Sequence, residues 1–178
     1  MVSPGLLTSN KQDWSTPQSM IDWLIQNGII HPLTFDLAAS RSNTKAAKFF
    51  TVEDDALKQK WPPGVLWLNP PFDRELPRFL EKALEELWDG RTEETIIWVF
   101  IPCRTDTRWF HELVWPNAEE IFFLKGRVNF LEHGKSKKAN APFPNMLFSF
   151  RGPFSNSRWH QQNPMCRTLE PGLEARGR

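Results

Sequence analysis

Four residues, Asn69–Pro70–Pro71–Phe72, follow the apolar run Val65–Leu68 and combine polar, rigid and aromatic groups in direct succession. The Asn69 side-chain oxygen and the Pro70 carbonyl could both accept hydrogen bonds from one amine, and the two prolines fix φ at adjacent positions. An aromatic amine held by two acceptors becomes tetrahedral, so its lone pair can attack a methyl donor, while the Phe72 ring offers a face for stacking. The motif therefore predicts electrostatic activation of an aromatic amine. A proline-rich turn that merely ends a strand is the structural alternative.

The elements that must position this motif alternate between strands and helices. Apolar runs predict strands at residues 65–68, 95–102, 120–124 and 145–150, and a short strand within 33–39. Helical spacing predicts helices over 76–88 and 107–115, and an earlier one that has Thr16 as its N-cap, Pro17 at its first position and Gly28 at its end. This order indicates an α/β fold with a mainly parallel sheet. The last two strands have no helix between them, which favours an antiparallel hairpin at one edge.

Composition limits the classes of protein to consider. The 178 residues are 40% hydrophobic and 24% charged, which is typical of a globular domain. A formal net charge of +1 excludes a protein that binds polyanions with its whole surface, so any contact with nucleic acid must come from a local patch. Cys103 and Cys166 are isolated, which argues against a disulfide framework and a zinc site, and we expect no metal.

The same pass gives an expected organisation of the chain. Residues 1–12 are expected to be a flexible lead-in, 13–152 the catalytic domain, and 153–178 a polar, poorly ordered tail. The N-terminus lacks the apolar run of a signal peptide, and no stretch of about 18 apolar residues occurs. We therefore expect a cytoplasmic protein.

Basic residues gather after two of the predicted strands. One group lies within a segment of 14 residues whose one acid is Glu132. Its members are Lys125, Arg127, Lys135, Lys137 and Lys138. Such a cluster would contact phosphates; an ordinary solvated loop is the alternative. A second set, Arg104, Thr105 and Arg108, follows the strand at 95–102 and is a candidate for contacts with the backbone or bases of a nucleic acid, although Asp106 could instead pair with one of the arginines.

A series of segments in a fixed order resembles the phage-type DNA adenine methyltransferases (Dam), over about residues 13 to 150. The matching segments are Asp13–Pro17, Phe35–Ser40, Glu53–Leu57, Asn69–Phe72, Pro102–His111, Leu124–Arg127 and Ala141–Pro144. The resemblance implies a reduced Rossmann-like fold dependent on S-adenosyl-L-methionine. It also implies an enzyme that methylates the exocyclic amine of a flipped adenine in double-stranded DNA. Extrusion of the base is needed because its amine cannot be reached inside a duplex.

The resemblance also implies where the cofactor binds. Thr16 and Pro17 would lie near its methionine end, and Asp36, with Ala38 and Ala39, would form the first cofactor loop. An acidic side chain at a strand end can hold the donor's amino group, although Asp36 could instead be a helix N-cap or a surface carboxylate. The chain departs from larger methyltransferases in lacking Gly-x-Gly after Asp36, which leaves Asp54 and Asp55 as candidates for the ribose, with exposed loop acids as the alternative.

Two other functions share these features. Asn-Pro-Pro-aromatic motifs also serve enzymes that methylate RNA or protein glutamine, and a nucleic-acid-binding module with a decayed site would keep the basic patch. The basic loop and the phage-type series favour DNA as the substrate.

Overall fold

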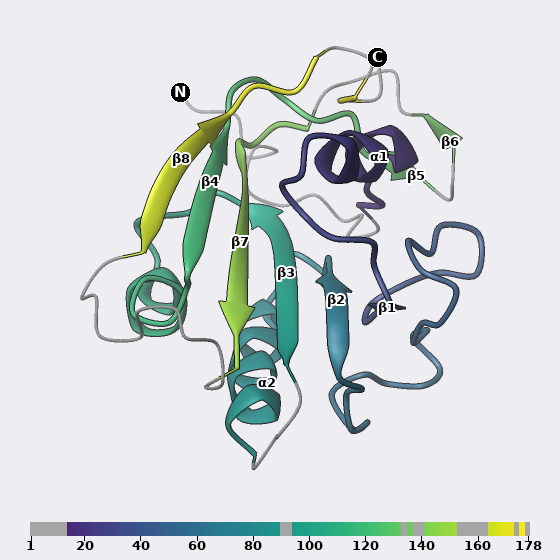
Figure 1. Ribbon diagram of the computed structural model, residues 1–178, viewed down its shortest axis with the longest axis vertical. Coiled ribbons are helices and arrows are strands. Elements are labelled where there is room, and N and C mark those ends of the chain that lie inside the picture. The colour runs from purple at the N-terminus through teal and green to yellow at the C-terminus, as the bar shows by residue number, and fades with distance from the viewer. Residues whose placement is uncertain are drawn as a thin grey trace, which may run out of the picture.

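The computed structural model describes residues 14–89, 94–132, 135–136, 141–152, 164–172 and 175–176, and in this part of the chain six strands form one sheet (Figure 1). In chain order these strands are β1 (Phe35–Asp36), β2 (Gly64–Leu68), β3 (Thr95–Pro102), β4 (Glu120–Leu124), β7 (Asn145–Arg151) and β8 (Met165–Leu169). Their order across the sheet is β1-β2-β3-β7-β4-β8. A separate hairpin pairs β5 (Leu131–Glu132) with β6 (Lys135–Ser136).

The sheet is mainly parallel, as predicted. Strand β7 is antiparallel to both β3 and β4, and every other neighbouring pair is parallel. Five strands therefore place their carboxyl ends at one edge, the upper edge in Figure 1. The predicted edge hairpin is wrong in its placement. Strand β7 pairs with β4 but lies between β3 and β4, where neighbours on both sides and both faces bury every residue from Asn145 to Phe150.

The expectation of a disordered tail after residue 152 is wrong for residues 165–169. These form β8, which pairs in parallel with β4 from Glu120↔Met165 to Leu124↔Leu169 and forms the sheet edge. Of its five residues only Leu169 is buried. Backbone hydrogen bonds, rather than an apolar pattern, hold this strand in place, so no hydrophobic period marks it in the sequence. Residues 153–163 lie outside the described part.

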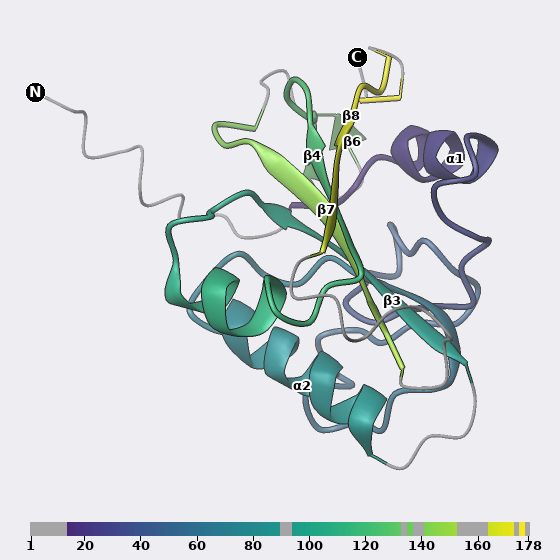
Figure 2. The same ribbon diagram turned by 60° about the vertical axis from the view of Figure 1, so that its left-hand side comes forward.

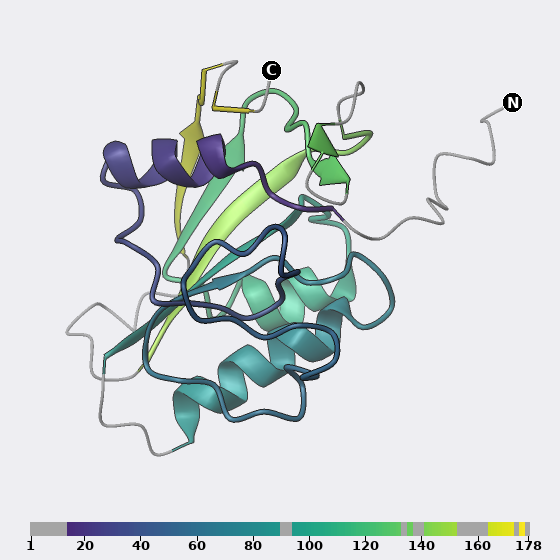
Figure 3. The same ribbon diagram turned by 90° about the vertical axis from the view of Figure 1, so that its right-hand side faces the viewer.

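Helices cover both faces of the sheet (Figures 2 and 3). Helix α2 (Leu76–Trp88) and the π-helical turn η2 (Phe110–Val114) lie on one face, where Leu80 and Leu87 pack in one core cluster with Ile97 and Phe148. Helix α1 (Gln18–Gln26) lies on the other, and its buried residues belong to a second cluster that contains Trp98 and Phe100. The strands β2, β3, β4 and β7 are mostly apolar without alternation because both of their faces are covered.

Helix α1 begins differently from the prediction. It starts at Gln18, with Pro17 at the N-cap position, and no side-chain hydrogen bond caps it. The Thr16 side chain is buried and lines a cavity, so it does not serve as the N-cap. The predicted end is confirmed: Gly28 adopts a φ of 65° and its N–H donates to the Ile25 carbonyl, a conformation that glycine takes at little cost.

Candidate active site

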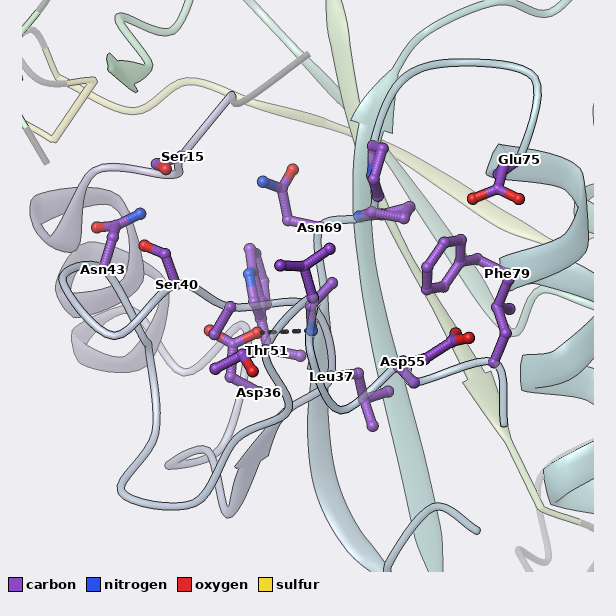
Figure 4. Close-up of a pocket in the computed structure, with 18 of the residues that line it drawn as sticks. Ser15, Asp36, Leu37, Ser40, Asn43, Thr51, Asp55, Asn69, Glu75 and Phe79 are labelled. Atoms are coloured by element: carbon purple, nitrogen blue, oxygen red, sulfur yellow. Dashed lines mark hydrogen bonds between the residues drawn. The ribbon is translucent and has the colours of Figure 1, made fainter. Parts of the chain in front are cut away.

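A cavity of about 890 Å³ opens at the carboxyl ends of β1 and β2. Asp36 is the last residue of β1 and pairs with Trp67 in parallel β2, so the loops that follow the two strands start side by side. The cavity is lined by Asp36, by Asn69 and by residues from the start of α2. Figure 4 shows Asn69 between two groups of side chains, one around Asp36 and Asn43 and the other around Asp55, Glu75 and Phe79.

Asp36 is a buried carboxylate with partners on both oxygens. Its side chain is 2% exposed, and burial raises its pKa to about 6 against the lowering effect of two backbone hydrogen bonds. These come from the N–H of Ala38, at 3.3 Å to Oδ1, and from the N–H of Lys45, at 2.8 Å to Oδ2. The second bond forms because the loop after β1 turns back along the strand, where Phe49 forms an isolated β-bridge with Asp36. The alternatives of a helix N-cap and a surface carboxylate are therefore excluded.

The Asn69 carboxamide is held in one orientation. Its Nδ2 donates to the backbone carbonyl of Trp14, which can only accept, so Oδ1 is the free end of the group. Oδ1 is buried and has no hydrogen-bond partner in the part of the chain that the structure describes. Pro70 and Pro71 line the cavity beside it. A buried acceptor without a partner is costly in a folded protein, and here the residue that carries it lines a cavity.

The predicted cofactor residues divide into those that reach the cavity and those that do not. Thr16 lines it, and its buried Oγ1 has no hydrogen-bond partner within the described ranges, whereas Pro17 is not among the lining residues. Ala38 and Ala39 both line the cavity. Thr16 is thus a second residue of the cavity wall with a buried polar atom that has no partner among the described residues.

The two candidates for the ribose-binding acid have separate environments. Asp54 does not line the cavity: its Oδ2 accepts the N–H and the hydroxyl of Thr51, each at 2.8 Å, and so closes a turn. Asp55 lines the cavity, adopts a φ of 53° and pairs with Lys58 at 2.8 Å. Both carboxyls have a pKa below the usual range because of these hydrogen bonds. The geometry favours Asp55.

Phe72 lies in an aromatic cluster rather than among the residues that line the cavity. Its ring is partly buried and makes edge contacts with Phe130, at 5.9 Å between ring centroids, and with Phe143, at 5.7 Å. Trp14 contacts the same two rings. The residue that ends the Asn-Pro-Pro-Phe motif therefore packs against both core clusters, next to the segment that orients Asn69.

The candidate DNA contacts follow the carboxyl ends of β3 and β4, and hence lie at the same edge of the sheet as Asn69. Arg104 and Thr105 are exposed. Arg108 is paired with Glu112, not Asp106, at 2.8 Å to each oxygen. Lys125 is exposed and pairs with Glu170 at 3.0 Å, and Arg127 is half-buried. The side chain of Lys135 and all of Lys137 and Lys138 lie outside the described residues.

Sequence reasoning missed several residues of the cavity wall. Lys45 and Asn43 come from the irregular loop after β1, and Glu75 and Phe79 come from the start of α2. Residues 40–59 have no periodic pattern that would identify which side chains turn inward. The one available signal is the proximity of Lys45 to Asp36 in sequence, which gains meaning only once Asp36 is known to be buried.

Within the described ranges, no helix has the length and apolar character needed to cross a membrane, and no group of three or more His, Cys, Asp or Glu residues could hold a metal ion.

The fold and the site together define an α/β protein with a cavity among the loops beyond the carboxyl ends of parallel strands, the place where open α/β sheets bind ligands. Residues 5–164 match the family model described as DNA N-6-adenine-methyltransferase (Dam), so the chain belongs to that family of DNA adenine methyltransferases.

Two curated relatives carry the name DNA N-6-adenine-methyltransferase. The one from Escherichia phage T1 is 34% identical over 113 residues, which cover 63% of this chain and 44% of the relative. The one from Haemophilus phage HP1 is 26% identical over 160 residues, which cover 88% of this chain and 89% of the relative. The match thus spans less than half of the T1 protein and most of the HP1 protein.

Proposed function

We propose that this chain transfers a methyl group from S-adenosylmethionine to N6 of an adenine flipped out of double-stranded DNA, in the cavity at the carboxyl ends of β1 and β2. The fold that carries this activity is a reduced Rossmann-like methyltransferase fold, and residues 13–152 hold the catalytic groups. The observation that carries the proposal is the buried, unpartnered Oδ1 of Asn69 beside a cavity that also contains the buried carboxylate of Asp36.

The residues present fit this methyl donor. A cavity of about 890 Å³ is within the range of sites for small ligands and cofactors. The donor carries an ammonium, a carboxylate and a sulfonium, with one net positive charge. Five acids and four bases line the cavity and leave one excess negative charge: Asp36, Glu53, Asp55, Asp73 and Glu75 against Arg41, Lys45, Lys58 and Arg78.

Specific side chains would hold each part of the donor. Asp36 has lone pairs beyond those used by its two backbone donors, so it binds the ammonium. The unpartnered hydroxyl of Thr16 provides a further polar contact at this end. Asp55 accepts hydrogen bonds from the ribose hydroxyls, and the small side chains of Ala38 and Ala39 permit close approach.

The chemistry follows from what Asn69 and Pro70 can accept. When bound, S-adenosylmethionine supplies a methyl group on a positively charged sulfur. The Asn69 Oδ1 and the Pro70 carbonyl each accept one N–H of the adenine amine, which localises the nitrogen lone pair and stabilises the positive charge that develops there. The extra proton leaves the nitrogen afterwards, so no histidine base is needed.

The DNA is held outside this cavity. Arg104, Thr105, Lys125 and Arg127 follow strands that end at the same edge as Asn69, which supports contacts with phosphates beside the flipped base. Arg108 contributes if the duplex competes with Glu112 for its guanidinium. The cluster is completed by Lys135, Lys137 and Lys138, which stay predictions from the sequence.

The test is tritiated methyl transfer from S-adenosylmethionine to duplex DNA, RNA and protein, with wild-type protein and Asn69→Ala. We expect label in adenine of DNA alone, and a loss of about 100- to 1,000-fold in the variant, as for removal of one such catalytic hydrogen-bond partner. Binding of S-adenosylhomocysteine is the matched control and should be retained. Near-normal turnover in Asn69→Ala would refute the mechanism. Label in RNA or protein instead of DNA would show that DNA is not the substrate.

A further inference from the structure

Lys45 has no role in the function proposed so far, although it lines the cavity beside Asp36. Its side chain is half-buried. Its backbone N–H donates to Asp36 Oδ2 at 2.8 Å, which fixes the two residues next to each other. Its Nζ donates to Asn43 Oδ1, and Asn43 in turn reaches the backbone carbonyl of Thr16 with Nδ2 at 3.5 Å.

Burial disfavours the charged form of the Lys45 ammonium. Burial lowers the pKa of Lys45 to about 8, although the charges of Asp36 and Asp22 oppose that change. Asp36 is in the converse position, because burial raises the pKa of its carboxyl. An ammonium has three N–H donors, of which one is used by Asn43. A positive and a negative group, both poorly solvated, thus lie together in one wall of the cavity.

A ligand group that matches this pair carries a positive and a negative charge close together. The amino-acid end of the proposed methyl donor does so, with an ammonium and a carboxylate on one carbon. We propose that Lys45 Nζ binds the carboxylate of the donor's amino-acid end while Asp36 binds its ammonium. This inference rests on the proposed function, since it requires that the cavity hold the donor.

The other cations of the cavity wall are engaged elsewhere. Lys58 is exposed and pairs with Asp55 at 2.8 Å, and Arg78 is exposed and pairs with Glu75 at 2.7 Å. Arg41 is also exposed, and its charge acts on the exposed carboxyls of Glu53 and Asp54. Lys45 is therefore the described cation that is both half-buried and adjacent to Asp36, where the donor's ammonium is expected.

The experiment compares two changes that should remove the same contact. Lys45→Met deletes the ammonium but keeps an unbranched side chain. Removing the carboxylate from the ligand gives a decarboxylated S-adenosylhomocysteine that retains its amine. Binding of S-adenosylhomocysteine, the decarboxylated analogue and 5′-methylthioadenosine, which has neither group, is measured by calorimetry. The matched control is Lys48→Met, which removes an exposed ammonium outside the cavity wall.

We expect Lys45→Met to weaken binding of S-adenosylhomocysteine by about 10- to 100-fold, the range for a hydrogen bond between charged groups. The wild-type protein should lose affinity by a similar factor when the ligand lacks its carboxylate. The variant should bind the decarboxylated analogue and 5′-methylthioadenosine within about twofold of the wild type, because the contact is then already absent. Lys48→Met should match the wild type with all three ligands.

Two results would overturn the inference while leaving the proposed function intact. One is an equal loss in Lys45→Met for ligands with and without the carboxylate, which would assign Lys45 a structural role. The other is wild-type affinity that does not change when the carboxylate is removed. Failure of the wild-type protein to bind S-adenosylhomocysteine would refute the proposed function, and this inference with it.

Discussion

The carboxyl of Asp36 is expected to destabilise the folded protein at neutral pH, and Asp36→Asn tests this directly. Burial raises its pKa from 3.8 to about 6, so the folded protein binds this proton more tightly than the unfolded chain does. The contribution of Asp36 to stability is therefore greatest below pH 3.8 and is lost as the pH rises toward 6. Above pH 6 the cost levels off at about 3 kcal/mol, since one pKa unit corresponds to about 1.4 kcal/mol.

The substitution removes this titration. The free energy of unfolding of Asp36→Asn, relative to wild type, should rise by about 2–3 kcal/mol between pH 4 and pH 7.5. Asn can accept only one of the two N–H groups of Ala38 and Lys45, because its NH2 group is a donor. This loss does not depend on pH, so the pH dependence isolates the charge. The range ends at pH 7.5 because the pKa of Lys45 falls to about 8.

Urea unfolding at five pH values measures the difference, provided the two proteins share one denaturant dependence. Asp106→Asn is the control, because this exposed carboxyl should give differences within about 0.5 kcal/mol over the same range. The variant should also lose binding of S-adenosylhomocysteine. Stability curves for Asp36→Asn and wild type that stay parallel from pH 4 to pH 7.5 would show that Asp36 is not a buried charge, and the reasoning about the cavity wall would fail.

Three further predictions concern the base, the DNA and the fold. Phe72→Leu tests whether the ring, which lies outside the cavity wall, still stacks on the flipped base as the sequence predicts. Loss of that stacking should reduce kcat/KM for DNA by an amount equivalent to about 1–3 kcal/mol, and an unchanged kcat/KM would show that the ring only packs in its aromatic cluster. Replacing Lys125 and Arg127 with Gln should reduce the slope of log affinity for DNA against log salt by about 2; an unchanged slope would place the duplex elsewhere. Gly64→Ala should destabilise the protein by about 1–3 kcal/mol, because φ is 121° and a Cβ would lie 2.6 Å from Thr34 Oγ1. Gly172→Ala is the control in thermal unfolding, because a Cβ at Gly172 would meet open space. Equal losses of stability in the two variants would show that Gly64→Ala introduces no strain.

Much of the fold could be predicted because its central elements have strong local patterns. Residues 76–88 show helical spacing and form α2 with those bounds, and the apolar run at 95–102 forms β3. Strand β8 could not be predicted, because four of its five residues are exposed and its position depends on backbone pairing with β4. The central place of β7 depends likewise on pairing between residues far apart in sequence, which no local pattern encodes.

The site was predictable where a residue follows a strong strand, and not where it depends on a loop. Asn69 follows β2, so its place at the carboxyl end of the sheet could be inferred from the sequence alone. Lys45 reaches the cavity because the loop after β1 returns to form a β-bridge between Phe49 and Asp36. Phe72 packs against Phe130 and Phe143, the two rings that Trp14 also contacts. Both outcomes depend on tertiary packing of irregular segments.

The residues proposed for chemistry are also those whose environments are unfavourable for folding. Asp36 is a carboxylate out of water, and the Asn69 Oδ1 and Thr16 Oγ1 are buried without partners in the described chain. Each of these costs free energy that a nonpolar or exposed residue would avoid, and all three adjoin one cavity. Packing alone would not retain three such groups together. A ligand that supplies an ammonium, an amine donor and a polar contact would give each of these three groups a partner. Binding of such a ligand should therefore stabilise the folded protein.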